Sequence, residues 1–311
     1  MIEATAPAKV ILFGEHAVVY GRPALAAPVT HLRARATIEA TGGPGVRLVA
    51  PDLGRETRLE TARPDNPLAA TVRIVERHAG RTAPPGTTIS VTSAIPIASG
   101  LGSGAAIAVA VIRVLSLYMD LGLPREAVSA LAYEVERLHH GTPSGVDNTV
   151  IAFEQPVYFI RRQPENVIEP FVPARPLRLV IGDTGVRSAT KHVVGDVRGR
   201  WTADRVAYET IFDACGRLAE AGRAALMLGD LGEVGRLMSE NHAWLVKMGV
   251  SSAELDRLVA AAEAAGALGA KLSGAGRGGN MIALVNQRNE EAVCDALRIA
   301  GATRIHRSDV G

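Results

Sequence analysis

Glycine and serine residues gather in one short stretch, Ile95-Pro-Ile-Ala-Ser-Gly-Leu-Gly-Ser-Gly-Ala-Ala106, which joins a predicted strand to a predicted helix. Glycine lets the backbone come close to a ligand because it carries no side chain. The unpaired N–H groups at the start of a helix, together with the helix dipole, favour a phosphate group there. Gly100, Gly102 and Gly104 therefore predict a loop that binds phosphate.

Charged side chains in two other segments could act on a bound phosphate. Lys9, Glu15 and His16 bracket a short apolar strand, where an ion pair at the strand end would satisfy them if they stood alone. Glu136 lies at the margin of the apolar stripe of a predicted helix, and taken alone it would be a solvated charge. Asp147 lies among turn-forming residues before a predicted apolar strand, where an Asx turn or a helix cap is the simplest explanation.

The elements on either side of the glycine-rich stretch must hold it in place. Thr87–Ser93 alternates β-branched and small polar residues, which is typical of a half-buried strand. Ala105–Met119 is almost wholly apolar and indicates a buried helix. A second helix is predicted from Pro124 to Gly141. Its buried face is formed by apolar residues at helical spacing, Val128, Leu131, Val135 and Leu138.

Periodicity and turn residues predict the remaining elements. Strands are expected at residues 9–13, 33–40, 46–50, 57–61, 177–181, 281–285 and 302–307. Helices are expected at about 67–78, 203–228, 230–246, 252–265 and 288–300. Five prolines between Pro156 and Pro176 indicate a boundary, so the predicted domains are residues 1–172 and 173–311.

The composition bounds the class of protein. The chain has 311 residues, 47% of them hydrophobic and 21% charged, which favours two ordinary domains with real cores. The formal net charge is +2, and the scattered basic residues argue against a nucleic-acid partner. No signal peptide or membrane span is recognisable, so no membrane partner and a cytoplasmic location are expected. The two cysteines, Cys215 and Cys294, are expected to be buried structural thiols, and no zinc spacing occurs.

Residues 95–106 can be compared with three known kinds of phosphate-binding loop. A Walker loop requires Lys after its last glycine, and Ala105 stands there instead. The dinucleotide fingerprint matches in letters, but Asp120 ends a helix where that motif needs the end of a second strand. The pattern Pro-x-x-x-Gly-Leu-Gly-Ser-Ser-Ala closely resembles Pro96 to Ala105. It belongs to the superfamily of galactokinase, homoserine kinase, mevalonate kinase and phosphomevalonate kinase.

Three further segments are similar to the mevalonate kinases, in the family's order. Residues 9–26 resemble the first signature, Lys-x-x-x-x-Gly-Glu-His-Ala-Val-Val-Tyr-Gly-x-Pro-Ala-Leu-Ala, nearly letter for letter. Residues 136–147 resemble the second, Glu-x-x-x-His-Gly-x-Pro-Ser-Gly-x-Asp. Residues 271–280 resemble the third, Lys-Leu-Thr/Ser-Gly-Ala-Gly-Gly-Gly-Gly-Cys, and depart from it at Arg277 and Asn280. The loop from Gly182 to Lys191 resembles the family's Arg-Ser-Thr-Lys loop with an alanine inserted.

The resemblance implies an α+β, two-domain small-molecule kinase fold. Its N-terminal domain would be like domain 2 of ribosomal protein S5, and its C-terminal domain would be ferredoxin-like. It also implies transfer of the γ-phosphoryl group of ATP, with Mg²⁺, to the 5-hydroxyl of mevalonate in isoprenoid biosynthesis. A homodimer is a further expectation from the resemblance alone.

Site roles follow from the resemblance, position by position. Asp147 is expected to act as general base or to orient the hydroxyl, with Lys9 beside it. Ser103 and Glu136 are the expected Mg²⁺ ligands, although Gly104 stands where the family commonly has a second serine. The phosphates would bind to Pro96, Ser99, Gly100, Leu101, Gly102, Ser103, Gly104 and Ala105. Mevalonate would contact Glu15, His16, Ser144, Thr190, Lys191, Ser273, Gly274 and Ala275.

Three other functions are compatible with parts of this pattern. A sister kinase could act on phosphomevalonate, homoserine or a sugar, although the residues after His16 differ from those of galactokinases. A sensor could bind ATP without transferring phosphate, but the presence of Lys9, Glu136 and Asp147 together argues against it. A dinucleotide-dependent oxidoreductase lacks the strand that would carry its acidic residue.

Overall fold

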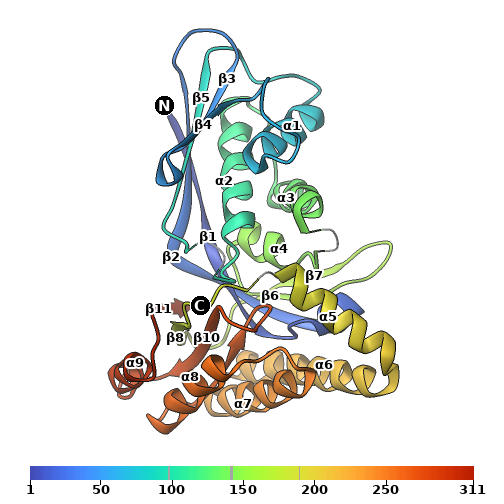
Figure 1. Ribbon diagram of the computed structural model, residues 1–311, viewed down its shortest axis with the longest axis vertical. Helices are drawn as coiled ribbons and strands as arrows, with labels where there is room; N and C mark the ends of the chain where they lie inside the picture. Colours follow the sequence, from blue (N-terminus) through green and yellow to red (C-terminus); the bar gives the residue numbers. More distant parts are fainter. Residues whose placement is uncertain (97–98, 141–142, 189) are drawn as a thin grey trace. The chain divides into compact units, whose positions relative to one another are not determined.

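The computed structural model describes residues 1–96, 99–140, 143–188 and 190–311 (Figure 1). The chain forms two compact units, each assembled from separate stretches. Unit 1 contains Met1–Ala8, Thr30–Pro96 and Gly102–Glu154, and unit 2 contains Lys9–Val29, Ile97–Leu101 and Gln155–Gly311. A boundary near residue 172 would be a single cut, and it stays a prediction.

Helices and strands occur throughout the described chain. The strands are β1 (Ile2–Phe13), β2 (Pro23–Ala40), β3 (Val46–Ala50), β4 (Arg55–Arg58), β5 (Thr87–Ser93), β6 (Val157–Ile160), β7 (Val167–Pro170), β8 (Leu177–Asp183), β9 (Gly269–Ser273), β10 (Asn280–Val285) and β11 (Arg304–Val310). The α-helices are α1 (Pro67–Ala79), α2 (Ser103–Tyr118), α3 (Arg125–His140), α4 (Val146–Phe153), α5 (Thr190–Ala203), α6 (Arg205–Leu228), α7 (Leu231–Met248), α8 (Ala253–Ala264) and α9 (Glu290–Ile299). Short 3-10 turns occur at Ala17–Tyr20 and Pro51–Leu53.

Unit 1 packs helices against a small sheet. The second half of β2 pairs antiparallel with β5, and β3 pairs parallel with β5 and antiparallel with β4. Helix α2 contacts β5 and both α1 and α3, which also contact each other. It is buried over most of its circumference, from Ala105 to Ser116, as its almost wholly apolar sequence predicts. The strand and helix flanking the glycine-rich stretch are therefore confirmed.

Helices α3 and α4 correct two expectations. Val128, Leu131 and Val135 are buried as predicted, but Leu138 is 64% exposed, so the apolar stripe ends before the helix does. The strand predicted after Asp147 is wrong, because residues 146–153 form helix α4. A short apolar run does not distinguish a strand from a buried helix. The predicted helix end at Gly141 lies outside the described residues.

Unit 2 contains an antiparallel four-stranded sheet in the order β11-β8-β10-β9. Strands and helices alternate as in a ferredoxin-like β-α-β-β-α-β unit, and the predicted α+β class is confirmed. Helices α7, α8 and α9 contact this sheet. Helix α5 was not predicted, and α6 begins at Arg205 rather than at 203.

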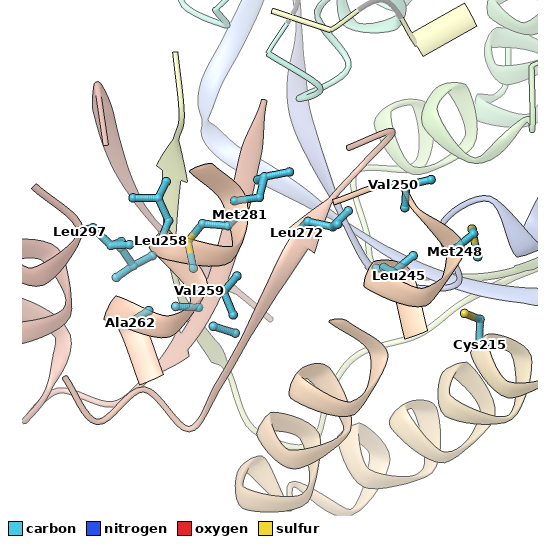
Figure 2. Close-up of a cluster of buried hydrophobic side chains, with 14 of the residues drawn as sticks. Cys215, Leu245, Met248, Val250, Leu258, Val259, Ala262, Leu272, Met281 and Leu297 are labelled. Atoms are coloured by element: carbon cyan, nitrogen blue, oxygen red, sulfur yellow. The ribbon is translucent and has the colours of Figure 1, made fainter. Parts of the chain in front are cut away.

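The core of unit 2 forms where these helices meet the sheet. Figure 2 shows Leu258, Val259 and Ala262 of α8 close to Met281 of β10 and Leu297 of α9. Both cysteines are buried, as predicted, and burial raises the pKa of the Cys215 thiol to about 12. Within the described ranges, no helix is long and apolar enough to cross a membrane.

Candidate functional site

The glycine-rich stretch leads onto a helix start without a side-chain cap. Gly102 is the N-cap residue of α2, at a φ of 75°, a left-handed conformation that favours glycine. Because the N-cap residue Gly102 has no side chain, it leaves the first-turn N–H groups of α2 to donate to a ligand. Ala105 is buried and anchors this turn, whereas Gly104 is exposed. Ile97 and Ala98, between Pro96 and Ser99, lie outside the described residues.

A second glycine-rich segment, residues 273–280, packs against Ser99 and Gly100 within unit 2. Asn280 donates from Nδ2 to the Ser99 carbonyl oxygen at 2.5 Å, and both side chains are buried. A Cβ atom on Gly279 would lie 2.9 Å from that same oxygen, so a side chain there would force the segments apart. The segment continues into strand β10, as predicted, so it lacks the helix that a dinucleotide site requires.

Glu136 lies beside the start of α2 within unit 1. A Cβ atom on Gly104 would be 3.6 Å from Oε1 of Glu136, and the glutamate is half-buried on α3. Its carboxylate is therefore next to the helix start that the phosphates are predicted to use. No three His, Cys, Asp or Glu side chains converge as a metal cage among the residues that the structure covers. An ion held here would complete its shell with phosphate and water oxygens, as Mg²⁺ commonly does.

Glu15 forms a buried ion pair that the sequence did not predict. Its Oε1 bonds to Nζ of Lys271, which also donates to the Leu272 carbonyl oxygen at 2.7 Å. Oε2 of Glu15 has no hydrogen-bond partner among the described residues. Burial raises the pKa of Glu15, and the nearby ammonium of Lys271 opposes that rise. One carboxylate oxygen thus remains available to a bound hydroxyl.

His16 is held in a left-handed turn, with a φ of 58°. Nε2 is 2.9 Å from the Ala275 carbonyl oxygen, which can only accept, so Nε2 carries the proton. Burial lowers the pKa of His16 to about 4, partly offset by the bond to Ala275, and Arg277 also lowers it. The ring is therefore neutral near pH 7, and Nδ1 can act as an acceptor.

Ser273 joins β9 to β1. Its hydroxyl accepts from the Ile11 N–H at 2.9 Å and donates to the Ile11 carbonyl oxygen at 3.1 Å. A hydroxyl has one donor and two acceptor positions, so one acceptor position remains. Lys271, Ser273 and Ala275 alternate along the chain, and each contacts the segment from Ile11 to His16.

Asp147 lies in the first turn of α4 and is partly buried. A carboxylate is favourable there because the N-terminal end of a helix carries partial positive charge. The next residue, Asn148, donates to the carbonyl and hydroxyl oxygens of Ser129 on α3, at 3.0 and 2.9 Å. Asn148 thereby fixes α4 on α3. Ser144 accepts from the Val146 N–H at 3.3 Å just before the helix.

Thr190 and Lys191 begin helix α5, and both are exposed. Ala189 lies outside the described residues. Lys9 is buried in β1 and belongs to unit 2, whereas Asp147 belongs to unit 1, so the pairing of these two residues stays a prediction.

Three residues that make structural contacts near the candidate site had no predicted role. They are Lys271, Asn148 and Asn280. Lys271 and Asn280 stand at the two ends of the third signature, and Asn148 directly follows the second. Their place in the motifs was a usable signal, but their partners are distant in sequence and carry no local mark.

Comparison with known proteins agrees with these features. Residues 66–155 match the GHMP kinases N terminal domain, and residues 223–303 match the GHMP kinases C terminal domain. A mevalonate kinase from Pyrococcus abyssi is 37% identical over 325 residues, covering 97% of this chain and 94% of that protein.

Solved structures extend the likeness to the whole fold. The mevalonate kinase of L. major in complex with R-mevalonate has a TM-score of 0.85 and 30% identity, covering 100% of this chain and 96% of that one. The Methanococcus jannaschii mevalonate kinase has a TM-score of 0.86 and 26% identity, covering 99% and 98%. The chain belongs to the mevalonate kinases, within the GHMP kinase family.

Proposed function

We propose that the protein transfers the γ-phosphoryl group of ATP to the 5-hydroxyl of mevalonate, giving 5-phosphomevalonate and ADP in isoprenoid biosynthesis. The observation that carries this proposal is the 37% identity to a mevalonate kinase across 97% of the chain. The start of α2, where Gly102 offers no side-chain cap, and the second glycine-rich segment packed on Ser99 support it, because phosphoryl transfer requires a closely held triphosphate.

The triphosphate is proposed to lie along residues 96–105. The N–H groups at the start of α2 would donate to phosphate oxygens, and Gly100 and Gly102 would let the backbone approach them. Asn280 would keep Ser99 in place from the second glycine-rich segment. The complete proposed set is Pro96, Ser99, Gly100, Leu101, Gly102, Ser103, Gly104 and Ala105.

Ser103 and Glu136 are proposed to be the residues that would hold Mg²⁺ when ATP is bound. The ion would neutralise charge that develops on the transferred group. The donor set fits the ion, since a hydroxyl and a carboxylate are hard oxygen ligands and Glu136 lies beside Gly104 at the start of α2.

Asp147 is proposed to take the proton of the 5-hydroxyl as its oxygen attacks phosphorus, or to orient that hydroxyl. Lys9 would favour the ionised form of the carboxylate. The loose transition state of phosphoryl transfer places more weight on position than on proton removal. Asn148 would contribute by fixing the helix that carries Asp147.

Mevalonate is proposed to contact residues from several elements. The free oxygen of Glu15 and the acceptor Nδ1 of His16 suit its hydroxyl groups. Lys191, Thr190 and Ser144 suit its carboxylate or polar end. Ser273 would use its remaining acceptor position, and Gly274 and Ala275 would lie against the substrate. A homodimer is proposed from the family resemblance alone, and a cytoplasmic location is proposed because the sequence shows no recognisable signal peptide or membrane span.

The test is ADP release from ATP and Mg²⁺ by the purified protein, with mevalonate, 5-phosphomevalonate, homoserine and galactose measured in parallel. We expect turnover on mevalonate alone. Turnover on another acceptor would agree with the proposed phosphate-binding residues but would contradict mevalonate as the substrate. ATP binding without turnover on any of the four would favour a sensor.

A further inference from the structure

The sequence of helix α5 has a low intrinsic propensity to form a helix. Gly195 and Gly199 lie inside it, and Val193, Val194 and Val197 are β-branched, and both kinds of residue lower helix propensity. Of its fourteen residues, only Val193 and Val197 are buried. The helix therefore depends on contacts made by its polar side chains.

Arg277 supplies one of these contacts from the second glycine-rich segment. Its guanidinium forms an ion pair with Asp196 of α5 and donates from Nε to the Gly249 carbonyl oxygen at 3.3 Å. Its backbone N–H donates to the Val250 carbonyl oxygen at 2.7 Å. A Cβ atom on the preceding Gly276 would lie 1.9 Å from that oxygen, so the segment lies directly against the end of α7.

A second arginine, on α5, also contacts this end of α7. Arg200 donates from Nη1 to the carbonyl oxygens of Met248 and Gly249, at 3.2 and 3.3 Å. Side chains that donate to the last carbonyls of a helix satisfy groups that have no partner within it. Arg277 and Arg200 thus share the Gly249 oxygen, and α5 meets the glycine-rich segment at this point.

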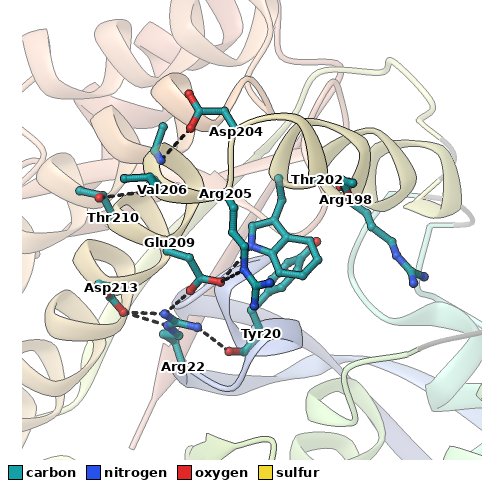
Figure 3. Close-up of polar contacts among 12 residues, drawn as sticks. Tyr20, Arg22, Arg198, Thr202, Asp204, Arg205, Val206, Glu209, Thr210 and Asp213 are labelled. Carbon is teal, nitrogen blue, oxygen red and sulfur yellow. Dashed lines mark hydrogen bonds and ion pairs between the residues drawn. The ribbon is translucent and has the colours of Figure 1, made fainter.

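A third contact lies at the far end of α5. Trp201 donates to Glu209 at 2.9 Å, and its ring is 5.2 Å from that of Tyr20. Figure 3 shows both Glu209 and Asp213 in contact with Arg22, which follows the Glu15–His16 turn in the chain. Nearer the beginning of α5, where Thr190 and Lys191 lie, Val193 packs into the core, and the ion pair of Asp196 with Arg277 is the nearest polar contact among the described residues.

We propose that Arg277 is a positioning residue, which ties α5 to the glycine-rich segment through Asp196 and so holds Thr190 and Lys191 where they meet the substrate. Arginine stands here in place of the glycine in the family's third signature, and its φ of 55° is one that favours glycine. A side chain kept in an unfavourable backbone conformation is consistent with a use for the guanidinium. The substrate part of this proposal rests on the proposed function, whereas the tether does not.

The experiment compares Arg277→Gly, Asp196→Asn and the double variant. Glycine suits the left-handed backbone, so Arg277→Gly removes the guanidinium without adding strain. We expect amide exchange in residues 190–203 to become about two- to fivefold faster in each single variant, the scale of one exposed ion pair. The mevalonate KM should rise by a similar factor, with kcat and the ATP KM unchanged. The double variant should resemble Arg277→Gly, because both changes break one interaction.

Two further variants make the result specific. Glu233→Gln removes a partner of Arg236 on α7, in the same unit, and should change neither quantity. Gly195→Ala adds a methyl group where nothing lies within 4 Å and strengthens the helix. In the Arg277→Gly background it should slow exchange in α5 and restore the mevalonate KM.

Opposite outcomes would overturn the proposal in distinct ways. Unchanged exchange in α5 after Arg277→Gly would remove the tether. If Gly195→Ala slows exchange in α5 of the Arg277→Gly protein but the mevalonate KM stays high, Arg277 touches the substrate instead of positioning α5. A wild-type protein silent on mevalonate would overturn the proposed function and the substrate part together, and exchange would still decide the tether.

Discussion

Lys271 and Glu15 form an ion pair inside unit 2 with both side chains withdrawn from water, at 0% and 1% exposure. Such a pair is costly to break, because removal of one partner leaves a charge buried without compensation. The pair also fixes Glu15 directly before His16. Lys271 is not among the residues predicted to bind the substrate, but it fixes the position of Glu15, which is among them.

Lys271→Met is expected to lower the free energy of unfolding by about 3–5 kcal/mol. Urea unfolding measures this, and adding Glu15→Gln to Lys271→Met should recover part of the loss because the orphaned charge is then absent. Arg236→Met, which breaks exposed pairs on α7, serves as the control and should cost about 1 kcal/mol or less. A double variant less stable than Lys271→Met would contradict this account.

Stability should fall on acidification because of His16. Its pKa is about 4 in the folded protein, below the ordinary 6.5, so between these values the unfolded chain binds the proton that the folded one does not. The stabilisation is complete above pH 6.5 and is lost as pH falls toward 4, for a total on the order of 3 kcal/mol.

The check is urea unfolding at several pH values, for the wild type and for His16→Asn. Asparagine tolerates the left-handed turn and does not titrate in this range. The wild-type slope between pH 6.5 and 4 should be steeper than that of the variant. Equal slopes would show that His16 is not the group responsible.

Asp147→Asn should reduce kcat by about 10²- to 10⁴-fold while ATP binding survives. The change keeps the shape of the side chain and removes the proton acceptor. Steady-state ADP release and nucleotide binding measure the two quantities. Glu254→Gln, which removes another acid in a helix first turn, controls for the loss of a helix-start charge. Near-wild-type turnover in Asp147→Asn would remove Asp147 from catalysis.

Glu136→Gln should raise the Mg²⁺ concentration needed for half-maximal activity by at least about tenfold. The carboxylate lies beside the start of α2, and an amide oxygen is a weaker ligand for a hard cation. Glu134, two residues earlier on α3, is exposed and pairs with Arg77 at 3.4 Å. Glu134→Gln should leave the Mg²⁺ titration unchanged. Identical titrations for both variants would reject Glu136 as a ligand.

Local patterns sufficed where one periodicity dominated the sequence. Strand β5 and helix α2 were predicted because alternation and an unbroken apolar run each have one simple solution. Helix α4 was predicted as a strand, since its apolar run is short and contains the β-branched Val150 and Ile151. What decides for the helix is contact with α3, through Asn148 and Ser129, which no local pattern encodes.

Helix α5 and the Glu15 pair show the same limit at longer range. Gly195 and Gly199 conceal the helix, and one of its tethers comes from Arg277, 81 residues beyond Asp196. Glu15 meets Lys271 across 256 residues. Family signatures identified both segments as functional, but they did not indicate which side chains join them.

The interleaving of the two units also affects how the chain is made. Lys9–Val29 is synthesised early, whereas the rest of unit 2 follows mainly from Gln155 onward. Glu15 consequently leaves the ribosome long before Lys271, and the two side chains cannot pair until Lys271 has also emerged. Domains commonly fold in order of synthesis, but unit 2 can close over its ion pair only after Lys271 has been synthesised. A shortened chain lacking residues beyond 270 would leave this segment without its partner.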